Sequence, residues 1–360
     1  MTLAPSGNVG EWSELYTLAF LLVNGGAYAA DENQNSIHET FYNVLEIFLA
    51  DKLPDTEIGY RINPNDISIE KGKIFFASVS KSEIESRLAT FFSDLSVTQS
   101  SPTFTLDSGS SLLQILGKNS ISASSAHKTS DLELIYEENT SKLPSPRIGF
   151  SIKSQLGAAS TLLNASGSTN FIFRVVPPAA AQENLKYPEM KSGAVRANMR
   201  LLSDLGYRFD FVSIDSENFT NNLELIDSYM PKYLAHLLIT AYSNSPTKMS
   251  EVSQLAFSAE DPTSKQRIFK IKQFLGAVAM GLRPAGHWDG DVTKFKGLIV
   301  VKVDGDVVFY YLYNLTAFQE FLYNSVKFEV PSTTRHKFGT IYREGDSDFI
   351  KLNLQIRFSK

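Results

Sequence analysis

The feature that most constrains the fold is the strict alternation of apolar and polar residues in "GFSIKSQLG", residues 149–157. Phe150 and Ile152 alternate with Ser151 and Lys153, which is typical of a β-strand with one apolar and one polar face. A serine, a lysine and, two residues further on, a glutamine therefore share one face of this strand. Lys153 is then either a solvated surface residue or the cation of a functional site.

Helical and strand-like patterns are mixed along the rest of the chain, which predicts an α/β fold. The segment "DLELIYEE" (131–138) is strand-like, and a polar turn with two prolines separates it from the alternating strand. Helices are predicted from about Ser13 to Gly25 and over 35–53, 81–95, 191–206, 218–244 and 264–282. Strands are predicted within 55–80, within 160–176, and from Gly297 onward, with hairpin turns at Asp304-Gly305 and Glu344-Gly345.

These patterns predict a single mixed α/β domain over residues 1–360, because no linker or internal repeat interrupts them. We expect its sheet to be flanked by helices and its C-terminal portion to be rich in strands. The expected parts are a core around 8–30 and 125–215, a helical and strand-containing insertion at 30–125, and a β-rich part at 285–360.

Composition excludes several kinds of chemistry. The chain has no cysteine, which rules out disulfides, thiol nucleophiles and zinc–thiolate sites and fits a reducing cytoplasm. Its five histidines are scattered, so any metal is expected on oxygen ligands, which favours magnesium or calcium. The apolar run 15–30 is too short to span a bilayer and follows acidic rather than basic residues. We therefore expect a cytoplasmic protein without a membrane partner.

Charge is unevenly distributed along the chain. Residues 1–98 hold 6 Lys and Arg against 14 Asp and Glu, whereas residues 99–360 hold 28 against 25. The net charge of −5 argues weakly against a nucleic-acid partner. A mildly basic surface on the later part could nevertheless face DNA, because local potential steers a ligand. Ordinary solvated charge explains the same counts equally well.

Asp131 and Lys153 stand on two successive predicted strands. If these strands are adjacent and antiparallel, the carboxylate and the ammonium come within a few ångströms of each other. That geometry suits phosphodiester hydrolysis: Asp131 and the backbone carbonyl of Ile152 would hold magnesium, and Lys153 would offset charge that builds on the phosphate. A half-exposed strand with a solvated lysine is the alternative.

The pattern resembles the PD-(D/E)XK nuclease motif, with one departure. Ser151 stands where the second acid is usually found, so the site has one formal negative charge fewer. Gln155, on the same strand face, could add an amide oxygen. Glu14 on the first predicted helix could supply a carboxylate as a catalytic and metal-binding residue, as nucleases of this class often have one there.

A wider resemblance strengthens this interpretation. The segments "GEWSELY", "SDLELIY", "GFSIKSQLG", "STLLNASGSTNF" and "RHKFGTIY…IKLNLQIRF" together resemble the HpaII-type restriction endonucleases, in the same order and over nearly the whole chain. The resemblance implies a PD-(D/E)XK (restriction-endonuclease-like) fold, Mg²⁺-dependent cleavage of double-stranded DNA and a CCGG target. On this view Asp131 is the metal ligand and Lys153 the catalytic lysine.

Arginines are the best readers of guanine in the major groove, so they are the first candidates for DNA contacts. Arg196 and Arg200 share one face of a predicted helix, although a solvated face is the simpler interpretation. Asn164 and Ser166 belong to a short polar loop that directly follows the site strand, where turn chemistry is the alternative. The other candidates lie in motifs shared with the resembled family: Arg335, His336 and Arg357.

Three functions remain open at this point. The first is a type II restriction endonuclease, which implies a protective methyltransferase in the same cell. The second is a structure- or damage-directed DNA nuclease on the same fold. The third is a DNA-binding protein whose site lost activity with the Ser151 departure. The sequence also leaves open whether the chain acts as a monomer or a homodimer.

Overall fold

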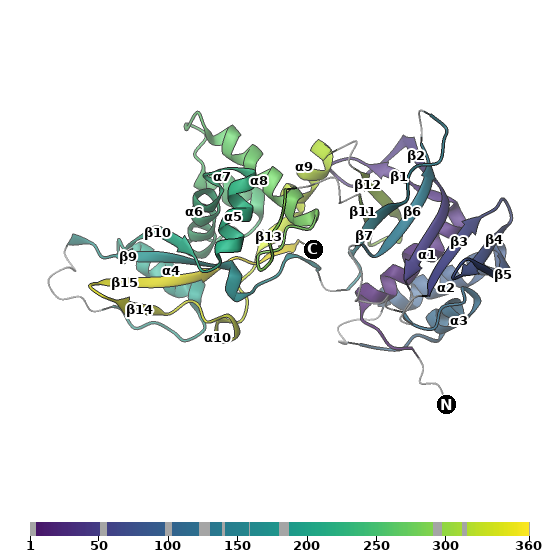
Figure 1. The fold of residues 1–360 in the computed structure, drawn as a ribbon. Coiled ribbons are helices and arrows are strands. Elements are labelled where there is room, and N and C mark those ends of the chain that lie inside the picture. Colours follow the sequence, from purple (N-terminus) through teal and green to yellow (C-terminus); the bar gives the residue numbers. More distant parts are fainter. Residues whose placement is uncertain are drawn as a thin grey trace. The chain divides into compact units, whose positions relative to one another are not determined.

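The computed structural model describes residues 5–50, 56–97, 103–121, 130–138, 141–157, 159–179, 187–290, 297–311 and 315–359. The chain forms two compact units (Figure 1). Unit 1 comprises residues 1–160, 295–318 and 360, and unit 2 comprises residues 161–294 and 319–359. The sequence predicts a single domain, whereas the structure has two units. The boundary after residue 160 divides the range 125–215, which we expected to belong to one core.

Unit 1 is built on a nine-stranded mixed sheet with the order β1-β12-β11-β7-β6-β2-β3-β4-β5. The pairs β1–β12 and β7–β11 are parallel, and the other neighbours are antiparallel. The strands are β1 (Gly26–Ala30), β2 (Ser36–Ala50), β3 (Glu57–Ile62), β4 (Asp66–Lys71), β5 (Ile74–Ser80), β6 (Leu132–Glu137), β7 (Ile148–Ser154), β11 (Gly297–Val301) and β12 (Val307–Tyr311).

The pairings close a ring within this sheet. Strand β2 is long: its first half pairs with β1, and its second half pairs with β6 and β3. The ring therefore runs β1-β12-β11-β7-β6-β2 and back to β1. Strands β6 and β7, which carry the predicted site, each have a neighbour on both sides, so their register is fixed from two directions.

Three helices of unit 1 pack against the core that lies on one face of the sheet: α1 (Val9–Asn24), α2 (Lys81–Val97) and α3 (Asp107–Ile115). Helix α1 begins before the predicted Ser13 because Asn8 and Glu11 form a reciprocal capping box. It ends, as predicted, at Gly25, which adopts the left-handed conformation with φ 68°. Helix α3 is not among the helices that the sequence predicts.

The predicted helix over 35–53 is wrong, because residues 36–50 form strand β2. The buried residues Tyr42 and Val44 alternate, and so do Ile47 and Leu49, but the register shifts between Val44 and Glu46. This bulge inserts one residue and turns a spacing of two into a spacing of three. The resulting apolar pattern imitates that of a helix.

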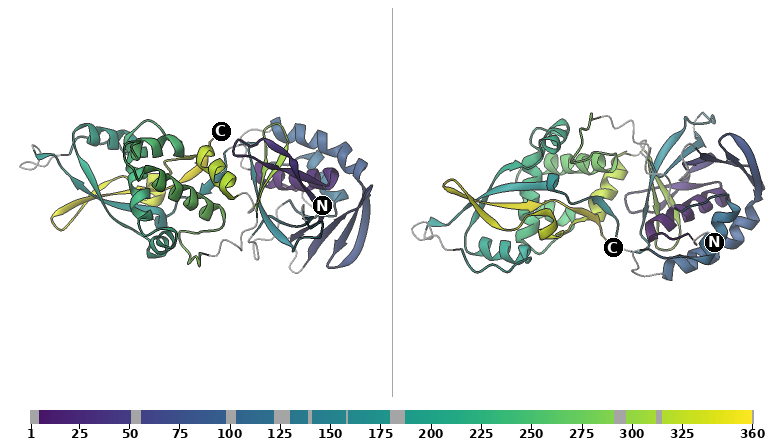
Figure 2. Two further views of the ribbon diagram at one scale, coloured as in Figure 1. Left: turned by 90° about the horizontal axis from the view of Figure 1, so that it is seen from above. Right: turned by 60° about the horizontal axis from the view of Figure 1, so that its bottom comes forward.

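Unit 2 contains a four-stranded antiparallel sheet, β10-β9-β15-β14, and a three-stranded sheet, β13-β16-β8. Figure 2 shows the long β14–β15 hairpin (yellow), and β15 pairs along β9 (teal). Its strands are β8 (Thr161–Leu163), β9 (Asn170–Val176), β10 (Arg208–Ile214), β13 (Val326–Phe328), β14 (Ile341–Glu344), β15 (Ser347–Asn353) and β16 (Ile356–Phe358).

Helix α6 lies at the centre of the helices of unit 2, since it packs against α4, α5, α7 and α8. The predicted helix over 218–244 is two helices, α5 and α6, because Asp227 ends the first and Pro231 occupies the first turn of the second. Helix α9 crosses the boundary between the units. The helices are α4 (Val195–Asp204), α5 (Glu217–Ile226), α6 (Met230–Ser243), α7 (Met249–Ala256), α8 (Ser264–Ala279), α9 (Leu315–Ser325) and α10 (Thr333–His336).

The mixed α/β class, with a large mixed sheet flanked by helices and a strand-rich C-terminal portion, is confirmed. The hairpins at Asp304-Gly305 and Glu344-Gly345 also form as predicted. Within the described ranges, none of the helices has the length and apolarity that crossing a bilayer requires.

Candidate functional site

Asp131 directly precedes strand β6, and its carboxylate contacts strand β7 at Ile152, next to Ser151. The register pairs Leu132 with Phe150, so the residue before β6 lies opposite Ser151. Phe150 and Ile152 belong to the core and are 1% and 8% exposed. Since side chains alternate along a strand, Ser151 and Lys153 lie on the face that points away from this core. The structure thus brings together the acid, the serine and the lysine that the sequence predicts.

A hydrogen bond fixes the carboxylate of Asp131. Its Oδ2 accepts from the backbone N–H of Ile152 at 2.7 Å, while its own N–H donates to the carbonyl of Phe150 at 2.9 Å. The side chain therefore continues the hydrogen bonding between β6 and β7 just before β6 begins. This tie holds Asp131 against the strand that carries Lys153.

The backbone carbonyl of Ile152 points toward the same side of β7 as Asp131. Phe150 and Ile152 direct backbone groups to the β6 side, whereas the N–H of Gln155 donates to Val301 of β11. Alternate residues of a strand address the same neighbour, so the Ile152 carbonyl faces the open end of β6.

The side chain of Lys153 forms no ion pair or hydrogen bond with the part of the chain that the structure describes. Its side chain is half-buried, on a strand held between β6 and β11. Its positive charge is therefore not compensated by a neighbouring carboxylate of those residues. An ammonium group without an ion-pair partner, as at Lys153, is suited to bind an anionic group of a ligand.

Gln155 lies just past the end of β7, and its Nε2 donates to Oε1 of Gln34. Gln34 belongs to the turn between β1 and β2, and it adopts the left-handed conformation with φ 68°. The turn is fixed by Asp31, whose carboxylate accepts from the N–H groups of Asn33 and Asn35 at 2.8 Å. Sequence reasoning missed Gln34, because nothing in the sequence pairs residues 121 positions apart.

Glu14 comes from the other face of the sheet. Helix α1 covers the face that carries Phe150 and Ile152, and the neighbouring Ser13 donates from Oγ to Oγ of Ser154 at 2.8 Å. Helix α1 is therefore anchored near the end of β7, but on the side opposite Lys153. The structure does not group Glu14 with Asp131 and Lys153 on one face.

The donors at this strand end suit magnesium better than zinc. Among the described residues, no three His, Asp or Glu side chains are grouped as metal ligands. Magnesium commonly uses only one or two protein carboxylates and completes its six positions with water and substrate phosphate. One carboxylate (Asp131), one carbonyl (Ile152) and one hydroxyl (Ser151) fit that pattern.

The predicted DNA contacts fall in unit 2, where four of the seven share one pocket. This pocket has a volume of about 480 Å³, and the four are Asn164, Arg335, His336 and Arg357. Glu329 also lines it and pairs with Arg357 at 2.8 Å, from Oε2 to Nε. Two arginines and a histidine beside one glutamate leave the pocket with excess positive charge.

Ser166 is held in the turn next to this pocket. Its backbone N–H donates to Oγ1 of Thr169, and its carbonyl accepts from Nδ2 of Asn353 at 2.7 Å. The buried Asn170 that follows donates to the carbonyl of His336 at 3.1 Å. These bonds connect the loop after β8 to α10, so the residues around the pocket keep a fixed arrangement.

Arg196 and Arg200 have different surroundings. The Nη2 of Arg196 donates to the carbonyls of Ala241 and Asn244 at 2.7 and 2.8 Å, and Arg200 also donates to Asn244 at 2.8 Å. These carbonyls end helix α6, where cations are favourable. Burial lowers the pKa of Arg196, and the charge of Arg200 lowers it further. The structure thus does not bring them to the pocket of Arg335.

Comparison with known proteins defines the class. A sequence model described as HpaII restriction endonuclease matches residues 8–358, which span both units. The chain is a site-specific deoxyribonuclease of type II, and it belongs to the HpaII restriction endonuclease family. It is 34% identical to the Type II restriction enzyme HpaII of Haemophilus parainfluenzae over 365 residues, which cover 99% of this chain and 100% of that enzyme. No solved structure matches the chain.

The hydrogen bond of Asp131 has a consequence for stability. We expect Asp131→Ala to lower the free energy of unfolding by about 1–3 kcal/mol, because the N–H of Ile152 loses its acceptor. Asp131→Asn keeps an acceptor oxygen at the same position and should cost less. Urea unfolding of the two variants tests this, and equal losses would contradict the role of this bond.

Proposed function

We propose that the enzyme hydrolyses phosphodiester bonds of duplex DNA at CCGG sites with Mg²⁺, through a PD-(D/E)XK-type site on β6 and β7. The observation that carries this proposal is the hydrogen bond that holds the Asp131 carboxylate at the N–H of Ile152, the residue between Ser151 and Lys153 on β7. Membership of the family and the five ordered motifs support the CCGG target. A cytoplasmic location belongs to the same proposal.

Asp131, the Ile152 carbonyl and the Ser151 hydroxyl would hold the magnesium ion in this site. The ion, when bound, supplies positive charge against the phosphate that is cleaved. Gln155 lies just past the end of β7, where its amide oxygen would add to the site, and its amide nitrogen is held by Gln34. Glu14, on the helix of the opposite face, enters the proposal only as a residue that would reach around the end of β7.

Lys153 acts on the phosphate itself in this scheme. A water molecule gives up a proton to solvent as its oxygen forms a bond to phosphorus, one ester P–O bond breaks, and the leaving oxygen takes up a proton from solvent. Negative charge builds on the phosphate oxygens during this step. The uncompensated ammonium of Lys153 donates hydrogen bonds to one of these oxygens and stabilises that charge. Asp131 keeps its orientation through the N–H of Ile152 during this step.

DNA contact in the proposal belongs to unit 2. Asn164, Arg335, His336 and Arg357 line one pocket with excess positive charge, and Ser166 lies in the adjoining turn. We assign base contacts first to Arg335, which is exposed and has no ion pair in the described part of the chain. Arg196 and Arg200 would act through the end of α6 rather than on bases.

Restriction also involves partners outside this chain. A methyltransferase that protects CCGG in the same cell is a functional partner in this proposal. A homodimer, in which two copies act on the two strands of a palindromic site, is the assembly we propose.

Digestion of a defined plasmid tests the function. With Mg²⁺ we expect discrete fragments whose sequenced ends fall within CCGG, and with a chelator we expect intact plasmid. Cutting only at branched or mismatched DNA would instead indicate the structure-directed nuclease. Ends without a common sequence would refute the CCGG target.

Lys153→Met should lower the cleavage rate by at least about 10²-fold, because an electrostatic stabiliser of the transition state is lost. Binding of CCGG duplex should change little. Lys142→Met is the matched control, since Lys142 lies in the connection between β6 and β7 and forms only a surface pair with Glu137. Equal rates for wild type and Lys153→Met would exclude the assigned role.

Arg335→Ala should weaken binding to CCGG duplex by about 1–3 kcal/mol and weaken binding to unrelated duplex less, because a base contact is lost. Competition binding with the two duplexes measures the difference. Arg208→Ala, an exposed arginine of the same unit outside the pocket, should leave the preference unchanged. An equal loss on both duplexes would make Arg335 a phosphate contact.

A further inference from the structure

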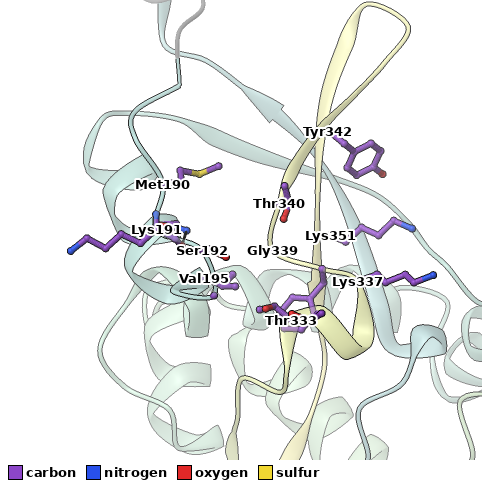
Figure 3. Close-up of a pocket in the computed structure, with 14 residues that line it drawn as sticks. Met190, Lys191, Ser192, Val195, Thr333, Lys337, Gly339, Thr340, Tyr342 and Lys351 are labelled. Atoms are coloured by element: carbon purple, nitrogen blue, oxygen red, sulfur yellow. Dashed lines mark hydrogen bonds between the residues drawn. The ribbon is translucent and has the colours of Figure 1, made fainter.

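Unit 2 holds a second, larger pocket of about 750 Å³, between residues 190–198 and the segment 333–342 (Figure 3). Lys191, Lys337 and Lys351 line it, together with hydroxyl groups of serine, threonine and tyrosine side chains. No Asp or Glu is among its described lining residues. Lysine and hydroxyl side chains, without a carboxylate among the lining residues, are suited to an anion rich in oxygen.

The walls of this pocket are fixed by close packing and hydrogen bonds. Gly339 has φ 83°, and a Cβ added there would lie 2.4 Å from Cγ2 of Val195, so the two walls touch. On the opposite wall, the buried Asn198 accepts from the N–H of Lys191 at 3.0 Å and donates to its carbonyl at 2.8 Å. The backbone of Lys191 is therefore held in place from inside the fold.

Two of the three charges are uncompensated. Lys351 donates to both carboxylate oxygens of Asp215 at 2.8 Å. Lys191 and Lys337 are exposed, and neither forms an ion pair with any residue that the structure describes. In Figure 3, Lys337 and Lys351 extend in the same direction from one wall, and Lys191 extends in the opposite direction from the other wall, so the ammonium groups of Lys191 and Lys337 lie at opposite rims of the pocket.

We propose that the two rims of this pocket bind phosphate groups of the DNA backbone, one rim through Lys191 and the other through Lys337. Lysine ammonium and hydroxyl groups are common phosphate contacts, and such contacts position a protein on the duplex without reading its sequence. The proposal rests on DNA as the substrate, which the family establishes, and does not depend on CCGG as the target.

Helix α10 connects this pocket to the one that carries the proposed base contact. Thr333, Thr334 and Lys337 line the phosphate pocket, whereas Arg335 and His336 line the other. A single helical turn thus contributes to both. A backbone held at Lys337 would fix the position of the duplex relative to Arg335.

Salt dependence of binding tests the proposal. The complete enzyme is titrated with CCGG duplex and with unrelated duplex at several NaCl concentrations, without divalent metal. For Lys191→Gln and Lys337→Gln we expect the slope of log Kobs against log salt to fall by about 0.9 each, on both duplexes. Lys232→Gln, at an exposed position of α6 outside the pocket, is the matched control and should keep the wild-type slope.

Three outcomes would overturn the proposal. The first is an unchanged slope in both variants, and the second is a loss confined to CCGG duplex. The third concerns free phosphate. Phosphate could raise the unfolding temperature of the wild type relative to chloride at equal ionic strength. If the variants lose this rise but keep the wild-type salt slope, the pocket binds the free ion and not DNA. If the wild type showed no preference for CCGG duplex, the proposed CCGG target would be contradicted. The comparison of salt slopes would still show whether this pocket binds DNA phosphates.

Discussion

The hydrogen bond from the Ile152 N–H to the Asp131 carboxylate is the interaction on which the proposed site depends. It takes the place of a backbone hydrogen bond between β6 and β7 just before β6 begins. It fixes the Asp131 carboxylate at Ile152, next to Ser151. It works because β6 and β7 lie inside a closed ring of strand pairings and cannot shift by one residue. A shift of that size would direct Lys153 into the core.

The two units differ in charge in a way that suits different tasks. Unit 1, with the proposed chemistry, holds 14 Lys and Arg against 21 Asp and Glu. Unit 2, with both basic pockets, holds 20 against 18. Local potential attracts a polyanion even when the whole chain is acidic. Cleavage is therefore proposed for unit 1 and DNA contact for unit 2, and the family match spans both units.

Local patterns were enough to predict β6, β7 and the face that Ser151 and Lys153 share. They failed at β2, because a bulge turned a strand pattern into the spacing of a helix. Contacts between distant segments were also out of reach: the bond of Gln155 to Gln34, and the bonds of Arg196 to the end of α6, depend on tertiary packing. Lys191 and Lys337 carry no local signal, since only the fold brings their segments to one pocket.

The most direct test of the account is calorimetric titration of Mg²⁺ into complexes with CCGG duplex, in a Lys153→Met background that should not cleave. We predict saturable Mg²⁺ binding, loss of that binding when Asp131→Asn is added, and binding about tenfold tighter, or about 1.4 kcal/mol, when Ser151→Asp is added instead. Mg²⁺ affinity that is the same with and without Asp131→Asn would contradict the account.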